Sequence, residues 1–265
     1  FIEVFSWDDW PANTPEAAVR SAPDATLAWL EAQAKLDAPR HMEIASLLRT
    51  WSRWIAYGNE RTKKPALRSV LLSLSQVSGV TANDEARIAM LNCAGYAQAE
   101  GMTAFVSGSL ESKSADVRIA ACEALGNLQS RASLESLIAA AESLVEKAEH
   151  RALVRAFGNY TESIEAGNAA LALLRETKHS DVRREILLVL KDTRWSKRDA
   201  FIRLGIENPD KGVLGAALDA IEGELPKDLQ DRVIDLASTE KKPWPDLVDA
   251  LGNLGDARGV AVITR

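Results

Sequence analysis

Residues 116–130 read DVRIAACEALGNLQS, and this stretch decides the fold class. Apolar residues recur between Val117 and Leu128 at the spacing that places them on one face of a helix. Asp116 belongs to the residue types that cap helix N-termini, and Gly126-Asn127 favours the left-handed conformation in which many helices end. The stretch therefore predicts an amphipathic helix that Asp116 caps and Gly126-Asn127 closes.

A second amphipathic helix is expected to follow from about residue 134. Its apolar positions keep the same helical spacing, at Leu134, Leu137, Ile138, Ala141, Leu144 and Val145. A single pair of such helices cannot bury both of its apolar faces, whereas stacked copies share a continuous core. The sequence should therefore contain further copies of the pair.

Related helix-closing triplets recur along the chain. They begin at Tyr57, Ala94, Leu125, Phe157, Leu190, Ile221 and Leu251. The steps between them are 37, 31, 32, 33, 31 and 30 residues, a period typical of helical repeat proteins. We therefore expect an all-α protein, a right-handed α-solenoid (superhelix) of about seven helix pairs.

The beginning of the chain departs from this period, and we expect residues 1–37 to form an N-terminal helical cap. Thr14-Pro15 and Pro23 are placed as helix starts, and Asp37-Ala38-Pro39 opens a longer run that ends at Tyr57-Gly58. Residues 38–265 are then a single continuous repeat domain. No sustained alternation of Val, Ile and Thr predicts a sheet.

The stretch DVRIAACEALGNLQS resembles the short HEAT-like repeat of phycobilin-lyase-type proteins and of many bacterial scaffold proteins. The pattern of that repeat is D-x-V-R-x-A-A-x-A-L-G, and Asp181-Val182-Arg183 begins a degraded copy of it. The resemblance covers roughly residues 40–265. It implies a fold rather than a function, because the motif residues are packing residues. One function that it leaves open is the handling of a tetrapyrrole or its carrier.

Composition excludes several classes of protein. The chain has 265 residues, a net charge of −6 and 46% hydrophobic residues, which fits a globular protein and not a generally basic nucleic-acid binder. No uninterrupted apolar run is long enough for a membrane helix, so no membrane partner is expected. The first residue is Phe1 and the last residues begin another helical pattern, so we expect a piece of a longer protein.

The chemistry-bearing residues predict neither an enzyme nor a cofactor. Cys93 and Cys122 lie in helical stretches and are expected to be buried thiols of a cytoplasmic protein. His41, His150 and His179 have no second ligand at helical spacing, so no metal site is expected. The motifs of nucleophilic hydrolases, phosphate-binding loops and zinc proteases are missing.

Two basic patches interrupt the acidic chain. Residues 49–68 hold six basic residues against one acidic residue, and residues 178–203 hold eight against four. Tryptophans lie within both patches, and basic charge beside aromatic rings favours binding of an anionic partner. The candidate binding residues are Trp51, Arg53, Trp54, Arg194, Trp195, Lys197 and Arg198. The alternative is that the tryptophans pack between helices while the basic side chains solvate outer faces.

The sequence allows two interpretations of Trp244 and two of a set of regularly spaced arginines. Trp244, between Pro243 and Pro245, must lie in a connection between repeats, where it either contacts a partner or seals the repeat interface. Arg87, Arg118 and Arg183 each precede a helix-closing triplet by seven residues. They form either a structural ladder between repeats or a row of anion receptors, and the second role requires exposed side chains.

The favoured function is a non-enzymatic scaffold for protein–protein interaction, with a concave helical docking surface for another protein or a peptide. The alternative is a HEAT-like nucleic-acid-binding protein or DNA-repair glycosylase. That alternative requires the two tryptophan-containing patches to converge on one groove, and the net charge of the chain opposes it.

Overall fold

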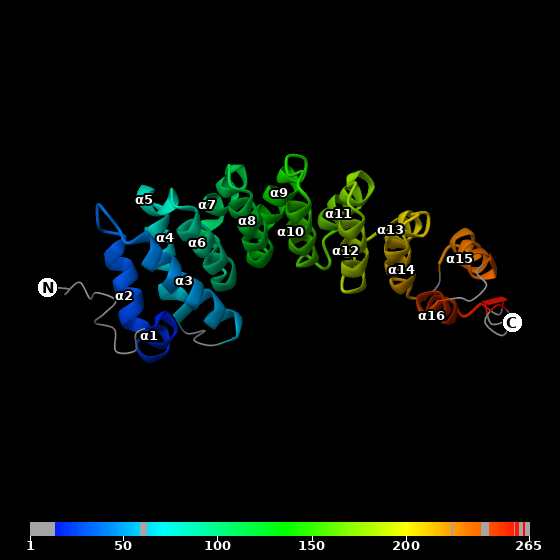
Figure 1. Ribbon diagram of the computed structural model, residues 1–265, viewed down its shortest axis with the longest axis horizontal. Helices are drawn as coiled ribbons and strands as arrows, with labels where there is room; N and C mark the ends of the chain where they lie inside the picture. The colour runs from blue at the N-terminus through cyan, green and yellow to red at the C-terminus, as the bar shows by residue number, and fades with distance from the viewer. Residues whose placement is uncertain are drawn as a thin grey trace. The chain divides into compact units, whose positions relative to one another are not determined.

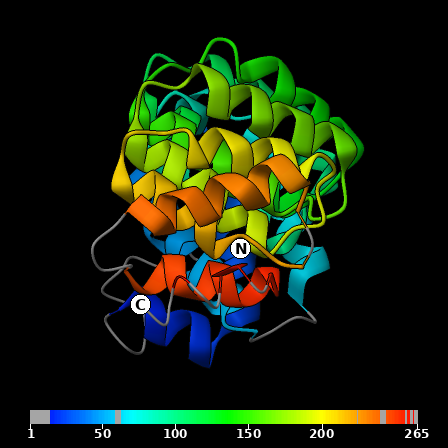
Figure 2. The ribbon, with the colours of Figure 1, turned by 90° about the vertical axis from the view of Figure 1, so that its right-hand side faces the viewer.

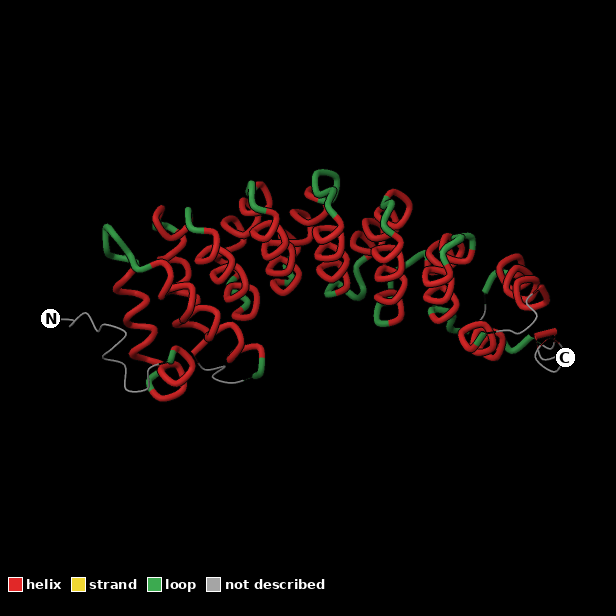
Figure 3. Tube along the Cα trace, viewed as in Figure 1, coloured by secondary structure: helices red, strands yellow, loops and turns green. Residues whose placement is uncertain are grey.

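The computed structural model describes residues 14–58, 63–223, 225–239, 244–256, 258–259 and 262. Every regular element within these ranges is a helix, so the predicted all-α class is confirmed (Figure 3). The chain divides into two compact units, Phe1–Ala140 and Ala141–Arg265. The predicted division into a cap over 1–37 and one continuous repeat domain stays a prediction.

The described helices of the N-terminal unit range from a single turn to 16 residues in length. They are α1 (Pro15–Ser21), α2 (Pro23–Gln33), α3 (His41–Ala56), α4 (Lys64–Ser75), α5 (Ser78–Thr81), α6 (Asp84–Ala97), η3 (Glu100–Met102), α7 (Thr103–Gly108), η4 (Ser109–Glu111), α8 (Ala115–Leu128) and α9 (Arg131–Ala140). The C-terminal unit contains α10 (Lys147–Gly158), α11 (Ile164–Glu176), α12 (Ser180–Lys191), α13 (Arg198–Ile206), α14 (Lys211–Asp219), α15 (Lys227–Thr239) and α16 (Pro245–Leu254).

The first helices begin where the sequence predicts. The Thr14 hydroxyl accepts a hydrogen bond from the Ala17 amide at 3.2 Å, and Pro15 occupies the first helical position. Helix α2 likewise begins at Pro23. Helix α3 ends at the predicted triplet, where Gly58 has a φ of 80°.

The helices that carry the recurring triplets pack side by side within each unit. In the N-terminal unit α3 packs against α6 and α6 against α8, with α2 against α4 and α7 against α9 beside them (Figure 1). In the C-terminal unit α10, α12, α14 and α16 form the corresponding row, and α11 packs against α13. Figure 2 shows α15 and α16 side by side. Each of the seven triplets begins within three residues of a helix end, three of them in the row of the N-terminal unit and four in that of the C-terminal unit.

The predicted roles of Asp116 and Gly126-Asn127 are wrong. Helix α8 has Ser114 at its N-cap, so Asp116 lies inside the first turn. The helix continues to Leu128, whose side chain is buried, and the left-handed residue is Gln129 with a φ of 53°. The helix therefore continues two residues past Gly126, and Leu128 belongs to its buried face, as the apolar spacing indicates.

Gly95, a triplet glycine of the N-terminal unit, lies where α6 and α8 pack closely. A Cβ at Gly95 of α6 would lie 3.0 Å from the Ala124 Cα of α8. Glycine therefore allows these two helices to approach closely.

The different roles of Asn83 and Asp116 predict different effects of their replacement on stability. Asn83 caps α6, its side chain accepting from the Ala86 amide at 2.9 Å, whereas Asp116 makes no such bond in α8. Asn83→Ala is expected to lower the free energy of unfolding by about 1 kcal/mol. Asp116→Ala should cause a much smaller loss. Urea denaturation followed by circular dichroism compares the two; a larger loss for Asp116→Ala would contradict the assignment.

Candidate functional site

The predicted binding residues belong to two clusters in different compact units. Trp51, Arg53 and Trp54 come from α3 of the N-terminal unit. Arg194, Trp195, Lys197 and Arg198 come from the α12–α13 connection and the start of α13 in the C-terminal unit. Each cluster is therefore a separate candidate site.

Trp51 is a core residue. Its side chain is 0% exposed, and its indole Nε1 donates to the Thr26 Oγ1 of α2 at 3.2 Å. A buried indole with its donor satisfied packs the helices together and has no face left for a partner. At Trp51 the structure therefore agrees with the packing alternative.

Trp54 lies over Trp51 and reaches the surface. The two ring centroids are 5.6 Å apart with an interplanar angle of 54°, and Trp54 is half-buried. Its ring lines a cavity of about 320 Å³ between α1 and α3, which we call the α1–α3 cavity. The lining residues are Glu16, Val19, Arg20, Thr50, Arg53, Trp54 and Tyr57.

Two side chains of the α1–α3 cavity are available to a partner. Tyr57 is 83% exposed, which is unusual for a large aromatic residue. Arg53 is exposed, and its guanidinium makes no hydrogen bond or ion pair with the part of the chain that the structure describes. Arg20, by contrast, pairs with Glu16 at 3.1 Å. The cavity therefore joins an accessible tyrosine, one unpaired cation and the face of Trp54.

Trp195 in the second cluster is also a core residue. It is 4% exposed, its Nε1 donates to the Tyr160 carbonyl at 3.0 Å, and its ring stacks on Phe201 at 5.9 Å. The neighbours of Trp195 in the sequence are polar and basic, but the fold brings α11 and α13 around its ring. It therefore anchors the α12–α13 connection.

The basic residues of the second cluster bind their own unit. Arg198 donates to the Leu190 and Ala220 carbonyls, each at 2.8 Å, and pairs with Glu222 at 3.1 Å. Arg194 pairs with Glu162 at 3.0 Å, and Lys197 donates to the Asn168 side chain at 2.9 Å. Since every cation of the cluster already has a partner, the α1–α3 cavity is the better candidate site.

The arginine ladder is half-buried and structural. Arg118 and Arg183 each donate to the carbonyl six residues earlier, at Ser112 (2.6 Å) and Thr177 (2.9 Å), while Arg87 donates to the Ser109 hydroxyl at 3.1 Å. The bonds of Arg118 and Arg183 tie α8 and α12 to the turns before them, and the bond of Arg87 ties α6 to η4. The anion-receptor role would require exposed side chains, which the ladder does not have.

An exposed charge ladder joins α10 and α12. Lys147 lies 2.5 Å from the Asp181 carboxylate, and Arg151 and Arg155 both contact Glu185. The hydrogen bond from Lys147 lowers the pKa of Asp181. At pH values above the ordinary pKa of an aspartate, the Lys147–Asp181 pair therefore stabilises the fold. This stabilisation is lost as the pH falls through the lowered pKa of Asp181 in the folded protein.

Replacing Lys147 with Met is expected to raise the pKa of Asp181 toward its ordinary value. An NMR titration of the Asp181 side chain measures this change directly. Asp256, whose pKa is lowered by a hydrogen bond from Arg258, is the internal control and should not move. An unchanged Asp181 titration in Lys147→Met would contradict the assigned cause.

His150 and His179 lie together in the C-terminal unit, and the two cysteines are buried in the N-terminal unit. His150 contacts the Leu144 carbonyl at 2.9 Å and the Thr177 hydroxyl at 3.2 Å, and its ring lies edge-on to His179 at 6.1 Å. Among the described residues no group of three His, Cys, Asp or Glu side chains is placed to hold a metal ion. Cys93 and Cys122 are buried free thiols, as predicted, and burial raises the pKa of Cys93.

Trp244 lies in a connection, as predicted. Helix α15 ends at Thr239, and Trp244 is the N-cap residue of α16, with Pro245 at the first helical position. Its half-buried ring faces the Lys211 ammonium, 5.7 Å from the ring centroid. Pro243 and the rest of residues 240–243 lie outside the described residues.

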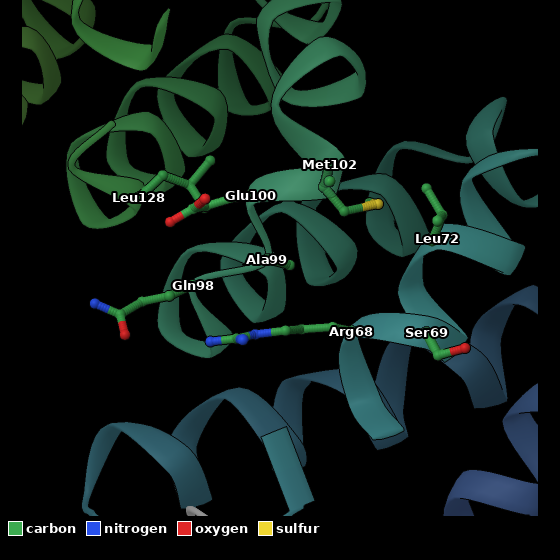
Figure 4. Close-up of a pocket in the computed structure, with 9 residues that line it drawn as sticks. Arg68, Ser69, Leu72, Gln98, Ala99, Glu100, Met102 and Leu128 are labelled. Carbon is green, nitrogen blue, oxygen red and sulfur yellow. The ribbon is translucent and has the colours of Figure 1, made fainter. Parts of the chain in front are cut away.

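Sequence reasoning missed a second cavity of the N-terminal unit. It has a volume of about 570 Å³ and lies between α4, the turn after α6 and the end of α8 (Figure 4). Arg68 belongs to the first basic patch, but Gln98 and Glu100, which share the cavity with it, are 30 and 32 residues further along the chain. Only tertiary packing brings them together.

None of the helices given above has the length and apolar character needed to cross a membrane. No protein-family model matches the sequence, and a search of curated proteins finds no match either. The functional assignment therefore comes from the geometry of the cavities.

Proposed function

We propose that the protein is a non-enzymatic scaffold for protein–protein interaction. About seven HEAT-like helix pairs form a right-handed superhelix, and its helical surface binds a protein or a peptide in the cytoplasm. The repeat-spaced rows of helices within each unit support this proposal, as do the free thiols of Cys93 and Cys122, which suit a reducing compartment.

The α1–α3 cavity carries the proposal. Residues that dominate binding energies at interfaces are most often Trp, Tyr and Arg, and Trp54, Tyr57 and Arg53 line this one cavity together. Packing on Trp51 restricts the ring of Trp54, so a partner would have to immobilise few side chains on binding. Glu16 and Arg20 pair with each other, so Arg53, which has no ion-pair partner among the described residues, gives the cavity lining a net positive charge. The favoured partner is a peptide segment with an acidic residue next to an aromatic or apolar one.

Peptide selection tests this proposal. A displayed peptide library is selected on the full chain, and the dissociation constants of selected peptides are measured by isothermal titration calorimetry. Tyr57→Ala and Arg53→Glu are each expected to weaken binding at least tenfold, which is about 1.4 kcal/mol. Arg175→Glu, at an exposed arginine of the C-terminal unit, is the control and should bind as the parent does. A selection without binders, or binders that tolerate both variants, would contradict the proposal.

The nucleic-acid alternative has weaker support. Recognition of single-stranded nucleic acid uses accessible aromatic faces, and the rings of Trp51 and Trp195 are buried. Fluorescence anisotropy with short single- and double-stranded DNA at two salt concentrations tests it. Binding tighter than about 10⁻⁴ M at low salt would revive the alternative. The scaffold proposal itself would be contradicted by enzymatic turnover that a single substitution in the α1–α3 cavity abolishes.

A further inference from the structure

The cavity shown in Figure 4, which we call the Arg68 cavity, carries charges of both signs. Helix α4 supplies one wall, the turn through η3 a second, and the end of α8 a third. The lining residues are Arg68, Ser69, Leu72, Gln98, Ala99, Glu100, Gly101, Met102 and Leu128. All of them lie in the N-terminal unit.

Arg68 has its orientation fixed but its charge unpaired. Its Nε donates to the Ala97 carbonyl at 2.7 Å, which holds the plane of the half-buried guanidinium. Neither terminal nitrogen has a hydrogen-bond or ion-pair partner in the described part of the chain. Figure 4 shows the side chain extended from α4 toward the side on which Gln98 lies. An oriented guanidinium of this kind suits the two oxygens of a carboxylate.

Glu100 supplies the opposite charge. Its carboxylate is exposed and makes no ion pair with any described residue, Arg68 included, although both line the same cavity. Figure 4 places Glu100 beside Leu128, across the cavity from Arg68. Two opposite charges that share a cavity without pairing can each bind the complementary group of one ligand.

The cavity also has apolar surface and a strained residue. Leu72 is 46% exposed, while Met102 and Leu128, which also line the cavity, are buried. Gln98, which also lines the cavity, has a φ of 54°, a conformation that non-glycine residues seldom adopt. The volume of about 570 Å³ is within the ordinary range of small-molecule sites.

We propose that the Arg68 cavity binds a zwitterionic ligand of dipeptide size with apolar side chains. The ligand carboxylate binds the terminal nitrogens of Arg68 and the amide of Gln98. Its ammonium group binds the Glu100 carboxylate, and its side chains pack on Leu72. This site is separate from the α1–α3 cavity and does not depend on the scaffold function.

Four probes test the charge requirement. Leucyl-leucine carries both charges, its N-acetyl derivative only the carboxylate, its C-terminal amide only the ammonium, and the doubly blocked form neither. Chemical-shift titration of the full chain up to about 10 mM covers the weak affinities expected of an open site. Leucyl-leucine is expected to bind at least tenfold more tightly than each blocked form and to shift the resonances of residues 98–102. Equal binding of all four, or no binding of leucyl-leucine, would overturn the proposal.

A matched pair of variants tests the position of the site. Glu100→Gln removes a charge without breaking a bond of the fold and should weaken leucyl-leucine binding at least tenfold. Glu111 of the same unit is also exposed and has no ion-pair partner among the described residues, so Glu111→Gln should leave leucyl-leucine binding unchanged. Arg68→Lys keeps the charge but loses the planar guanidinium, so it should also weaken binding. Unchanged binding in Glu100→Gln, or an equal loss in Glu111→Gln, would overturn the proposal.

Tyr57→Ala separates this proposal from the proposed function. It should leave leucyl-leucine binding unchanged while it weakens binding of a peptide selected on the α1–α3 cavity. A loss of leucyl-leucine binding in Tyr57→Ala would place the ligand in the α1–α3 cavity and overturn the assignment to the Arg68 cavity.

Discussion

Replacing Trp51 with Ala is expected to lower the free energy of unfolding by about 3–5 kcal/mol. The Trp51 side chain is 0% exposed, so the substitution removes a large buried aromatic surface and leaves a cavity between α2 and α3. It also removes the indole donor that bonds Thr26. Trp54 loses the ring on which it packs, so binding at the α1–α3 cavity should weaken as well.

Urea denaturation of Trp51→Ala measures this loss, with two variants for comparison. Trp51→Phe keeps an aromatic ring but not the donor, so its loss should be smaller. Tyr57→Ala, at an exposed position on the same helix, should change stability by no more than about 0.5 kcal/mol. If Trp51→Ala and Tyr57→Ala proved equally stable, Trp51 would not be the core residue described above.

Trp195→Ala is expected to destabilise the C-terminal unit by a similar amount, about 3–5 kcal/mol. The indole is buried, stacks on Phe201 and donates to the Tyr160 carbonyl. It also lies against Gly167 of α11, where an added Cβ would be 2.9 Å from the Trp195 Cβ. Gly167→Ala alone should therefore cost about 1–3 kcal/mol through overpacking.

A double-mutant cycle tests the contact between Gly167 and Trp195. Trp195→Gly removes the Cβ as well as the indole, so in that background Gly167→Ala should cost much less than in the parent chain. Hydrogen exchange of α11 and α13 amides reports the stability of this region separately from that of the N-terminal unit. Strictly additive losses would contradict the close contact.

Local sequence signals predicted the helices but not all of their ends. Helix starts at Pro15 and Pro23 depend on a proline and its neighbours, so a single sequence suffices to find them. The regular spacing of the triplets, which is also read from the sequence alone, indicated which helices pack in rows within each unit. The end of α8 lies beyond Gly126-Asn127 because Leu128 is buried, and that burial depends on other parts of the fold.

The candidate site was only partly predictable. Trp51 and Trp54 are three residues apart with similar neighbours, yet α2 covers Trp51 while Trp54 reaches the α1–α3 cavity. Tyr57 was identified as part of a helix end and not as a binding residue. Its exposure depends on how α1 and α3 pack, which their separate helical patterns do not specify.

Hydrogen–deuterium exchange of the full chain, with and without a selected peptide, tests the scaffold proposal most directly. Bound peptide should slow exchange in residues 15–21 and 50–57, which supply the two walls of the α1–α3 cavity. The protection should disappear in Tyr57→Ala and persist in Arg175→Glu. Protection confined to other helices, or protection that Tyr57→Ala leaves intact, would contradict a docking surface at this cavity.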